Sequence, residues 1–340
     1  MPTNLQPPRS FSHFSRAATP HRVRAPPSEF GPSSHVNLDN QPAALLPSMS
    51  RPLPLILRIV VVVFFLLILR LLAYTNISFP RPPTRAAAMP RSGPIRLAVL
   101  EADTPQPQTR ARVGSYTAVF TALFQGAYDT SSPPKTLADE LTITGHAIVD
   151  DLHAYPALDD VDAVLISGSR HNSFDSDPWI LKLVEFTRAA LATNRVRVIG
   201  VCFGHQILSR ALGCAVGRNP KGWEVAVTDV ELTPEGREVF GLEKMRIHQM
   251  HTDIVAEFPP DAVALGSNDV CSVQAMYSPG RYIAVQGHPE FTKEIVTEIL
   301  FNRHTVGVFT DELYNDGMSR VAQEHDGFAI ARGFLKFLRD

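Results

Sequence analysis

Short apolar runs alternate with longer amphipathic segments from residue 95 to residue 340. The apolar runs predict strands at 95–100, 146–150, 163–166, 196–201, 225–232, 245–250, 272–276 and 282–286. The amphipathic segments predict helices at 116–124, 178–192, 205–212, 292–303 and 327–338. Fully apolar strands that alternate with helices are typical of a mostly parallel sheet with helices on both faces. The pattern therefore predicts an α/β domain over residues 95–340.

The first 94 residues have a different composition. They contain ten arginines, no lysine and two acidic residues, a net charge of +8, whereas residues 95–340 carry −10. Residues 1–50 are rich in Pro, Ser and Arg without apolar periodicity, so we predict that they are disordered. Residues 53–74 are apolar except for Arg58 and Arg70, which predicts a transmembrane or targeting segment. Residues 75–94 form a Pro-rich linker to the α/β domain.

The strongest chemical signal is the segment 198–206, VIGVCFGHQ. An apolar strand leads directly into Cys202, which Gly200 and Gly204 flank, and a helix follows. This is the pattern of a nucleophile elbow, with a sulfur in place of the usual serine hydroxyl. The N-terminus of a helix favours the thiolate form of such a cysteine. The backbone N–H of Phe203 would point at a developing oxyanion.

A second signal supplies a base for the thiol. Residues 286–290 (QGHPE) follow the strand predicted at 282–286, so His288 would face Cys202 from a neighbouring strand end. A histidine in this place could also protonate a leaving amine. Glu290 could orient the imidazole, which is the role of the third member of a catalytic triad.

A small-residue turn, Ser167-Gly168-Ser169-Arg170, ends the strand predicted at 163–166. Such a turn can expose a backbone N–H, so Gly168 or Ser169 is a candidate second donor to the oxyanion beside Phe203. An ordinary Gly-Ser turn is the alternative interpretation of these residues.

Together these residues resemble those of the class I, triad-type glutamine amidotransferases, and the resemblance extends over roughly residues 95–340. It implies a flavodoxin-like fold and a triad of Cys202, His288 and Glu290. It also implies attack of sulfur on the γ-carboxamide of glutamine, a γ-glutamyl thioester and release of ammonia. Finally, it implies that the amino-acid end of the substrate lies near Gln206, Met250, His251, Thr252 and Asp253.

A closer resemblance exists within that family. The turn 167–170 and the segments 175–179 (DSDPW) and 219–224 (NPKGWE) look like those of stand-alone, GMP-synthase-like amidotransferase proteins of fungi and plants. The plant branch includes γ-glutamyl peptidases that trim glutathione conjugates. This sequence departs from the pattern at Ser169-Arg170, where many amidotransferases have Gly-Pro, at Arg197, and at Ala226, where related proteins tend to have Gly.

Three functions remain open on these residues. The first is an amidotransferase that gives ammonia to an acceptor, which a separate synthetase chain would have to activate. The second is a stand-alone γ-glutamyl peptidase or hydrolase that acts on γ-glutamyl peptides or glutathione conjugates. The third is a membrane-tethered, non-catalytic regulatory protein. For either enzyme the substrate would be glutamine or another γ-glutamyl compound.

No cofactor is predicted, since the sequence has neither a Walker loop nor a dinucleotide fingerprint. His248 and His251 have no third ligand or cysteine pair nearby in the sequence, so no metal site is predicted either. A net charge of −2 argues against nucleic acid as a partner, and three cysteines give no sign of a disulfide framework.

The location is expected to follow from the apolar segment and from the thiol. Because Cys202 works only as a free thiol, we predict a membrane-anchored protein whose catalytic domain faces the cytosol. The Arg-rich, acid-poor N-terminus is also typical of mitochondrial targeting. Translation from Met89 would instead give a cytoplasmic protein.

Overall fold

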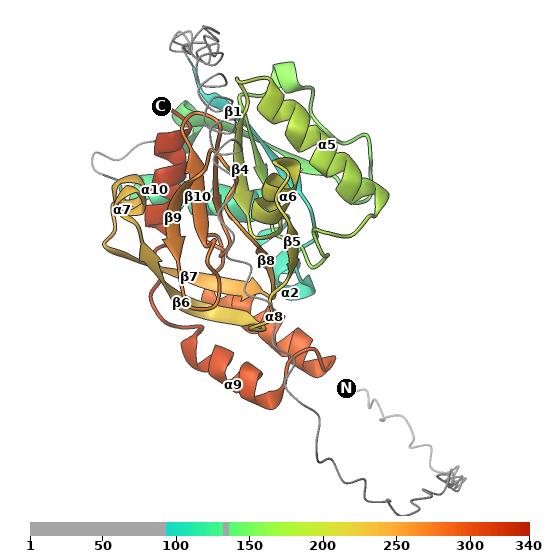
Figure 1. Ribbon diagram of the computed structural model, residues 1–340, viewed down its shortest axis with the longest axis vertical. Coiled ribbons are helices and arrows are strands. Elements are labelled where there is room, and N and C mark those ends of the chain that lie inside the picture. Colours follow the sequence, from blue (N-terminus) through green and yellow to red (C-terminus); the bar gives the residue numbers. More distant parts are fainter. Residues whose placement is uncertain (1–92, 132–135) are drawn as a thin grey trace, which may run out of the picture. The chain divides into compact units, whose positions relative to one another are not determined.

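The computed structural model describes residues 93–131 and 136–340 (Figure 1). Within them, nine strands form one sheet in the order β2-β1-β3-β4-β11-β10-β9-β6-β7, and β5 pairs with β8. The strands β2, β1, β3, β4 and β11 run parallel, and the remaining four extend the sheet in antiparallel fashion. The strands are β1 (Ile95–Glu101), β2 (Leu141–Ala147), β3 (Ala163–Ile166), β4 (Arg197–Val201), β5 (Val216–Arg218), β6 (Glu224–Leu232), β7 (Lys244–His251), β8 (Asp253–Val255), β9 (Val263–Ser267), β10 (Ala275–Ser278) and β11 (Tyr282–Val285).

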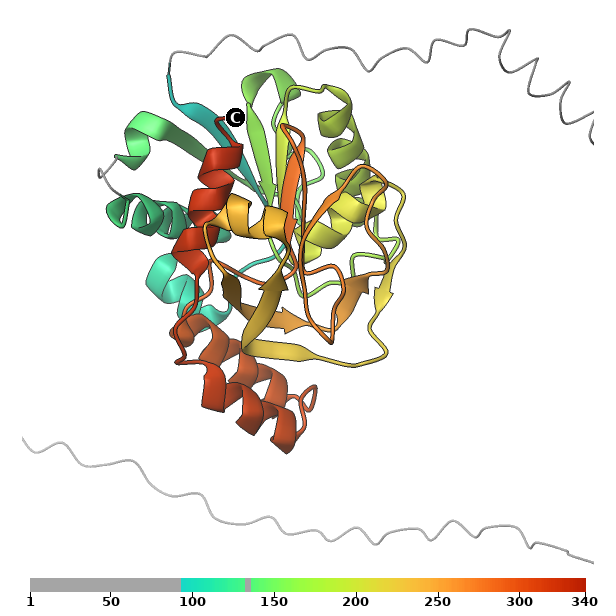
Figure 2. The same cartoon turned by 60° about the vertical axis from the view of Figure 1, so that its left-hand side comes forward.

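Helices cover both faces of this sheet. They are α2 (Pro107–Val113), α3 (Tyr116–Asp129), α4 (Leu137–Glu140), α5 (Pro178–Ala192), α6 (Phe203–Ala211), α7 (Pro234–Phe240), α8 (Lys293–Thr305), α9 (Asp311–Arg320) and α10 (Gly327–Phe337), with a short 3₁₀ turn at Leu158–Asp160. In Figure 1, α5 and α6 lie on the right of the sheet, and α7 and α10 lie on its left. Figure 2 shows α10, in red, beside α3 on that second face.

The centre of strand β1, residues 97–100, is apolar because both of its faces are covered. Leu97 and Val99 point to the face where they pack in one core with Phe120 of α3. Ala98 and Leu100 point to the opposite face and belong to the core beneath α5 and α6. Successive side chains of a strand alternate between the two faces of the sheet. Where both faces are covered, each of these positions is buried and favours an apolar residue. This confirms the predicted α/β, flavodoxin-like fold with helices on both faces.

Two predicted strands are wrong in position. The strand predicted at 146–150 is β2, which runs from 141 to 147 at the edge of the sheet and is largely exposed on one side. An edge strand has a weak apolar pattern, and the apolar residues Ile148 and Val149 come after it. The strand predicted at 272–276 is β10, which begins at 275; Val273 is buried in the core without belonging to a strand.

Ala226 adopts a left-handed conformation, with a φ angle of +57°. Residues with a Cβ rarely take such a φ, and glycine takes it readily. The conformation explains why glycine is favoured at this position, and the alanine of this chain adopts it despite its Cβ. Ala226 is completely buried, so its methyl group adds packing that glycine would lack.

The predicted membrane-anchored localisation is corrected by the structure. Within residues 93–131 and 136–340, no helix has both the length and the apolar character needed to cross a bilayer. The longest of them, α5, has 15 residues, whereas a spanning helix needs about 20. The apolar segment 53–74, on which the prediction of a cytosol-facing anchored domain rested, lies outside the described residues. The membrane-tethered regulatory protein loses its support for the same reason.

Candidate active site

Cys202 lies in the sharp turn between β4 and α6. Its φ and ψ angles are +51° and −105°, a conformation that is strained for a residue with a Cβ. The turn is held from two sides, because the N–H of Cys202 donates to the carbonyl of Val285 at 2.9 Å and its carbonyl accepts from the N–H of Gln206 at 3.1 Å. The amides at the start of α6 have no partner within the helix, as at every helix N-terminus. The turn therefore places a buried thiol at the N-terminus of α6.

The glycines that flank Cys202 are required by close backbone contacts. A Cβ on Gly200 would lie 2.8 Å from the carbonyl oxygen of Gly204, across the turn. A Cβ on Gly204 would lie 2.1 Å from the carbonyl oxygen of Ile166 in β3. Both neighbours are main-chain atoms, so neither can rotate away. The turn that was predicted from the sequence therefore packs closely against β3.

His288 follows β11, the parallel neighbour of β4, and its side chain is held by three contacts. Its Nδ1 lies 2.8 Å from the Oε1 atom of Glu290, and both side chains are almost inaccessible to solvent. The imidazole stacks on Phe291, with ring centroids 3.8 Å apart. Gly168 covers another part of the ring, because a Cβ there would lie 2.6 Å from its Cε1 atom. The backbone N–H of His288 also donates to the carbonyl of His248 at 2.7 Å.

The charge state of His288 is set by Cys202 and Glu290. Burial by itself would lower the pKa of His288, but the negative charges of Cys202 and Glu290, together with hydrogen bonds to both, outweigh it and raise the pKa to about 10. An imidazolium beside a thiol stabilises the thiolate form. The buried ring of His288 is therefore placed between Cys202 and Glu290, and both favour its charged form.

The turn 167–170 is fastened to the end of β1. The Ser167 hydroxyl accepts from the N–H of Ala102 at 2.9 Å and donates to the carbonyl of Gly168 at 3.0 Å. Asp103 accepts from the backbone N–H of Arg170 at 2.8 Å and from its guanidinium Nε at 2.9 Å. Arg170, which stands where many amidotransferases have Pro, thus ties down the turn by an ion pair. The structure brings Gly168 directly against His288.

Gln206 and the residues around 250–253 form a separate buried network. The Gln206 amide donates to the carbonyl of Asp253 at 2.9 Å and to Gln286 at 3.1 Å, and accepts from Ser173 at 2.9 Å. His251 Nε2 lies 3.1 Å from a carboxylate oxygen of Glu224. The amide of Gln206 and the imidazole of His251 therefore already have partners within the protein.

The predicted substrate-contact residues differ in where the structure places them. Met250 packs in the aromatic cluster that also contains Tyr116 and Phe291, the residue under His288. Within the described residues, no contact joins the side chains of His251, Thr252 or Asp253 to Cys202 or His288. That these residues hold the substrate stays a prediction.

Two residues near the thiol, Tyr116 and Arg303, could not be identified as site residues from the sequence. Burial raises the pKa of Tyr116, at the start of α3, and the charges of Asp103, Glu290 and Cys202 raise it further, so its hydroxyl lies within electrostatic range of the thiol. Arg303, near the end of α8, interacts electrostatically with Cys202, Tyr116 and Asp103. Both residues stand in ordinary amphipathic helices, and only the packing of α3 and α8 brings them to the site.

A cleft of about 600 Å³ adjoins the turn 167–170. It is lined by the segment 104–107, by Arg110 and Ala111 of α2, and by Arg170. The space is larger than ammonia needs, and two arginines line it. Figure 1 shows α2 and α8 near each other at this end of the sheet.

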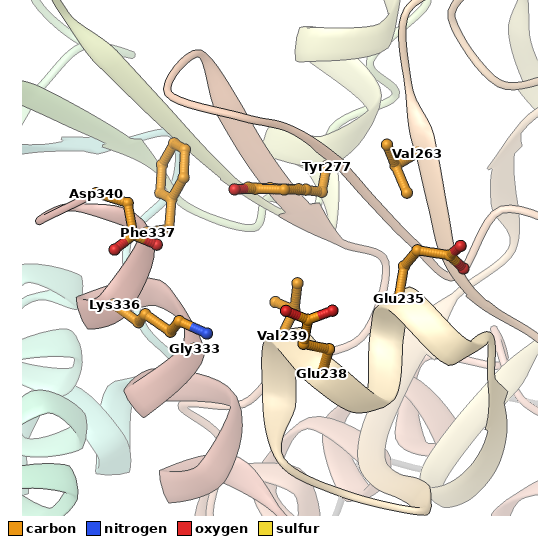
Figure 3. A pocket seen from close by; sticks show the side chains of 9 residues that line it. All are labelled: Glu235, Glu238, Val239, Val263, Tyr277, Gly333, Lys336, Phe337 and Asp340. Atoms are coloured by element: carbon orange, nitrogen blue, oxygen red, sulfur yellow. The ribbon is translucent and has the colours of Figure 1, made fainter. Parts of the chain in front are cut away.

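A second hollow, of about 230 Å³, lies at the other end of the parallel strands (Figure 3). Tyr277, Phe337, Lys336 and Glu238 line it, among others. Tyr277 pairs with Ile283 near the beginning of β11, whereas His288 follows the end of that strand. This hollow therefore takes no part in the site around Cys202.

Comparison with known proteins agrees with these observations. Residues 138–305 match the family model of class I glutamine amidotransferases. A glutamine amidotransferase-like protein of Schizosaccharomyces pombe is 32% identical over 246 residues, which are 71% of this chain and 98% of that protein. The γ-glutamyl peptidase 3 of Arabidopsis thaliana is 35% identical over 150 residues, which are 42% of this chain and 60% of the relative. A glutamine amidotransferase structure from Thermotoga maritima shares the fold, with a TM-score of 0.56 at 14% identity over 72% of this chain and 99% of that one.

Proposed function

This chain belongs to the class I glutamine amidotransferase family, and we propose that it cleaves γ-glutamyl amide bonds with Cys202 as the nucleophile. The observation that carries the proposal is the arrangement of Cys202, His288 and Glu290. A buried thiol at a helix N-terminus is paired with an imidazolium whose pKa is raised to about 10, and a carboxylate 2.8 Å away orients that ring.

The proposed reaction has two halves. The thiolate of Cys202 attacks the γ-carbonyl carbon, and the oxyanion is received by the N–H of Phe203 and by the N–H of Gly168 or Ser169. The C–N bond then breaks, and His288 gives its proton to the leaving nitrogen. A γ-glutamyl thioester remains. His288, now neutral, takes a proton from water, which attacks the thioester and releases glutamate and the thiolate.

We propose that the cleft beside Arg170, which adjoins the turn 167–170, receives the amine side of a substrate larger than glutamine. Ammonia, the leaving group from glutamine, would leave a space of about 600 Å³ empty. The amine side of a γ-glutamyl peptide could fill it, and its terminal carboxylate would meet Arg110 or Arg170. The activity named for the Arabidopsis relatives is of this kind. We therefore place γ-glutamyl peptides ahead of glutamine as substrates.

The test is to incubate the full chain separately with glutamine and with glutathione and to follow glutamate by mass spectrometry. We expect glutamate from both, with the higher kcat/KM for the peptide, and none from the Cys202→Ala variant. Release from glutamine alone would overturn the preference for peptides. No release from either, or equal release by the variant, would overturn the proposed function.

The Glu290→Gln variant is expected to shift the pH profile. In the native protein, kcat/KM should fall on the alkaline side near pH 10, where the imidazolium loses its proton. The carboxylate of Glu290 contributes to that raised pKa, so its removal should move the alkaline limb down by about one to two pH units. The control is Glu243→Gln, at a mostly exposed carboxylate paired with Arg237. An alkaline limb that stays in place in Glu290→Gln would rule out this role of Glu290.

A further inference from the structure

Among the described residues, one N–H group of the Arg303 guanidinium has no hydrogen-bond partner. The guanidinium lies 4.8 Å from the ring centre of Trp223 and 5.6 Å from that of Phe309, which pack edge to face. Its Nη1 atom is inaccessible to solvent and, among the described residues, has no hydrogen-bond partner. A buried N–H of a charged group costs considerable free energy when it is left without an acceptor. Such a group is typical of a site that receives an anion.

Asp103 is the carboxylate that interacts electrostatically with this guanidinium, and it already has a partner in Arg170. Burial lowers the pKa of Arg303, and the negative charges of Cys202, Tyr116 and Asp103 raise it by a smaller amount. However, Asp103 accepts hydrogen bonds from the backbone N–H and the guanidinium of Arg170. Its charge is therefore balanced by Arg170, and the charge of Arg303 is left for a ligand.

Arg303 also stands on a well-anchored helix. The carboxylate of Glu298, one turn earlier in α8, accepts from the N–H groups of Gln108 and Thr109 at 2.7 and 2.8 Å. Asn302 donates to Gln106 at 2.8 Å. These bonds fasten α8, and with it the backbone of Arg303, to the segment that lines the cleft.

We propose that Arg303 binds the α-carboxylate of the γ-glutamyl unit and so holds its γ-carbonyl at Cys202. This inference rests on the proposed function, because only a γ-glutamyl substrate brings that carboxylate to the site. A planar guanidinium matches a carboxylate with two parallel hydrogen bonds. Trp223 and Phe309 fix the plane of the guanidinium, and the cluster that contains Met250 and Tyr116 surrounds the aliphatic part of the ligand.

Three p-nitroanilides test the assignment, since they differ only in the acyl group. The γ-glutamyl compound has both α-substituents, the glutaryl compound has the carboxylate without the amine, and the 4-aminobutyryl compound has the amine without the carboxylate. We would measure kcat/KM in the full chain, and Kd by calorimetry in the Cys202→Ala background. The variants are Arg303→Gln, Arg303→Lys and, as a control, Arg332→Gln, which removes an exposed arginine of α10.

Arg303→Gln should lower kcat/KM and the affinity for the γ-glutamyl and glutaryl compounds about 100-fold. For the 4-aminobutyryl compound both quantities should change by less than about twofold. Arg303→Lys should restore part of the loss, and Arg332→Gln should change nothing. An equal loss for all three compounds, or no loss for any, would overturn the assignment. Arg303-dependent binding without amine release would overturn the proposed function and uphold the assignment. Cleavage that is unaffected by Arg303→Gln would uphold the proposed function and overturn the assignment.

Discussion

Replacing Cys202 by alanine is expected to reduce kcat/KM for a γ-glutamyl amide by about 10⁴-fold or more, because no other group can form the thioester. The fold should persist, since the substitution removes one sulfur from a turn held by backbone hydrogen bonds to Val285 and Gln206. The measurement is glutamate release by the full chain at saturating and at low substrate concentration, together with a thermal unfolding curve.

The matched control is Cys214→Ala. Burial raises the pKa of the Cys214 thiol, and its side chain packs in the core beneath α5 and α6. Burial likewise raises the pKa of Cys271 to about 12. Iodoacetamide should therefore alkylate Cys202 first, and substrate should slow that labelling. A Cys202→Ala variant that keeps a tenth of the native activity, or equal labelling of Cys202 and Cys214, would show that Cys202 is not the nucleophile.

Replacing Gly204 by alanine is expected to lower the free energy of unfolding by about 3 kcal/mol or more, because overpacking a rigid contact forces the backbone apart. The new Cβ would lie 2.1 Å from the carbonyl oxygen of Ile166. The helix α6 would have to move away from β3, and Cys202 would move with it. Activity should therefore fall together with stability. Urea unfolding followed by fluorescence measures the first effect, and glutamate release measures the second.

Gly217→Ala serves as the control for this substitution. A Cβ at position 217, in β5, would meet no atom within 4 Å, and the residue does not need a positive φ. Its free energy of unfolding should change by less than about 0.5 kcal/mol, as for most surface substitutions. If both variants unfolded at the same urea concentration, the contact between α6 and β3 would not be the constraint that we describe.

Much of the fold could be predicted from local sequence. The strand at 163–166 and the helix at 178–192 have the predicted bounds, because a fully buried strand and an amphipathic helix that begins at Pro178 carry strong local signals. Helix α7 went unpredicted although its signals are present: Thr233 caps its first turn, and Gly241 ends it with a φ of +68°. Strand β9 and helix α9 have short or mixed patterns that local rules do not resolve.

Part of the candidate site could likewise be predicted from local sequence, and part could not. Cys202 with its flanking glycines, and His288 with Glu290, are neighbours in the sequence, so their turn and their hydrogen bond follow from spacing. That the two pairs meet could be expected as soon as β4 and β11 were taken as adjacent parallel strands, because the carboxyl ends of such strands share one edge. That Gln206 helps to hold the substrate stays a prediction, and the partners of its amide group are visible only in the folded chain.

The sequence by itself determined the α/β architecture and the elbow that carries the thiol, because both depend on contacts between residues close in the chain or on apolar periodicity. Its motifs also carried the resemblance to the family. Only the tertiary structure decided which distant side chains surround that thiol. Arg303 and Tyr116 lie about a hundred residues to either side of Cys202, on helices whose own patterns say nothing of a site. An unpaired buried charge is a property of packing in three dimensions, and no local pattern encodes it.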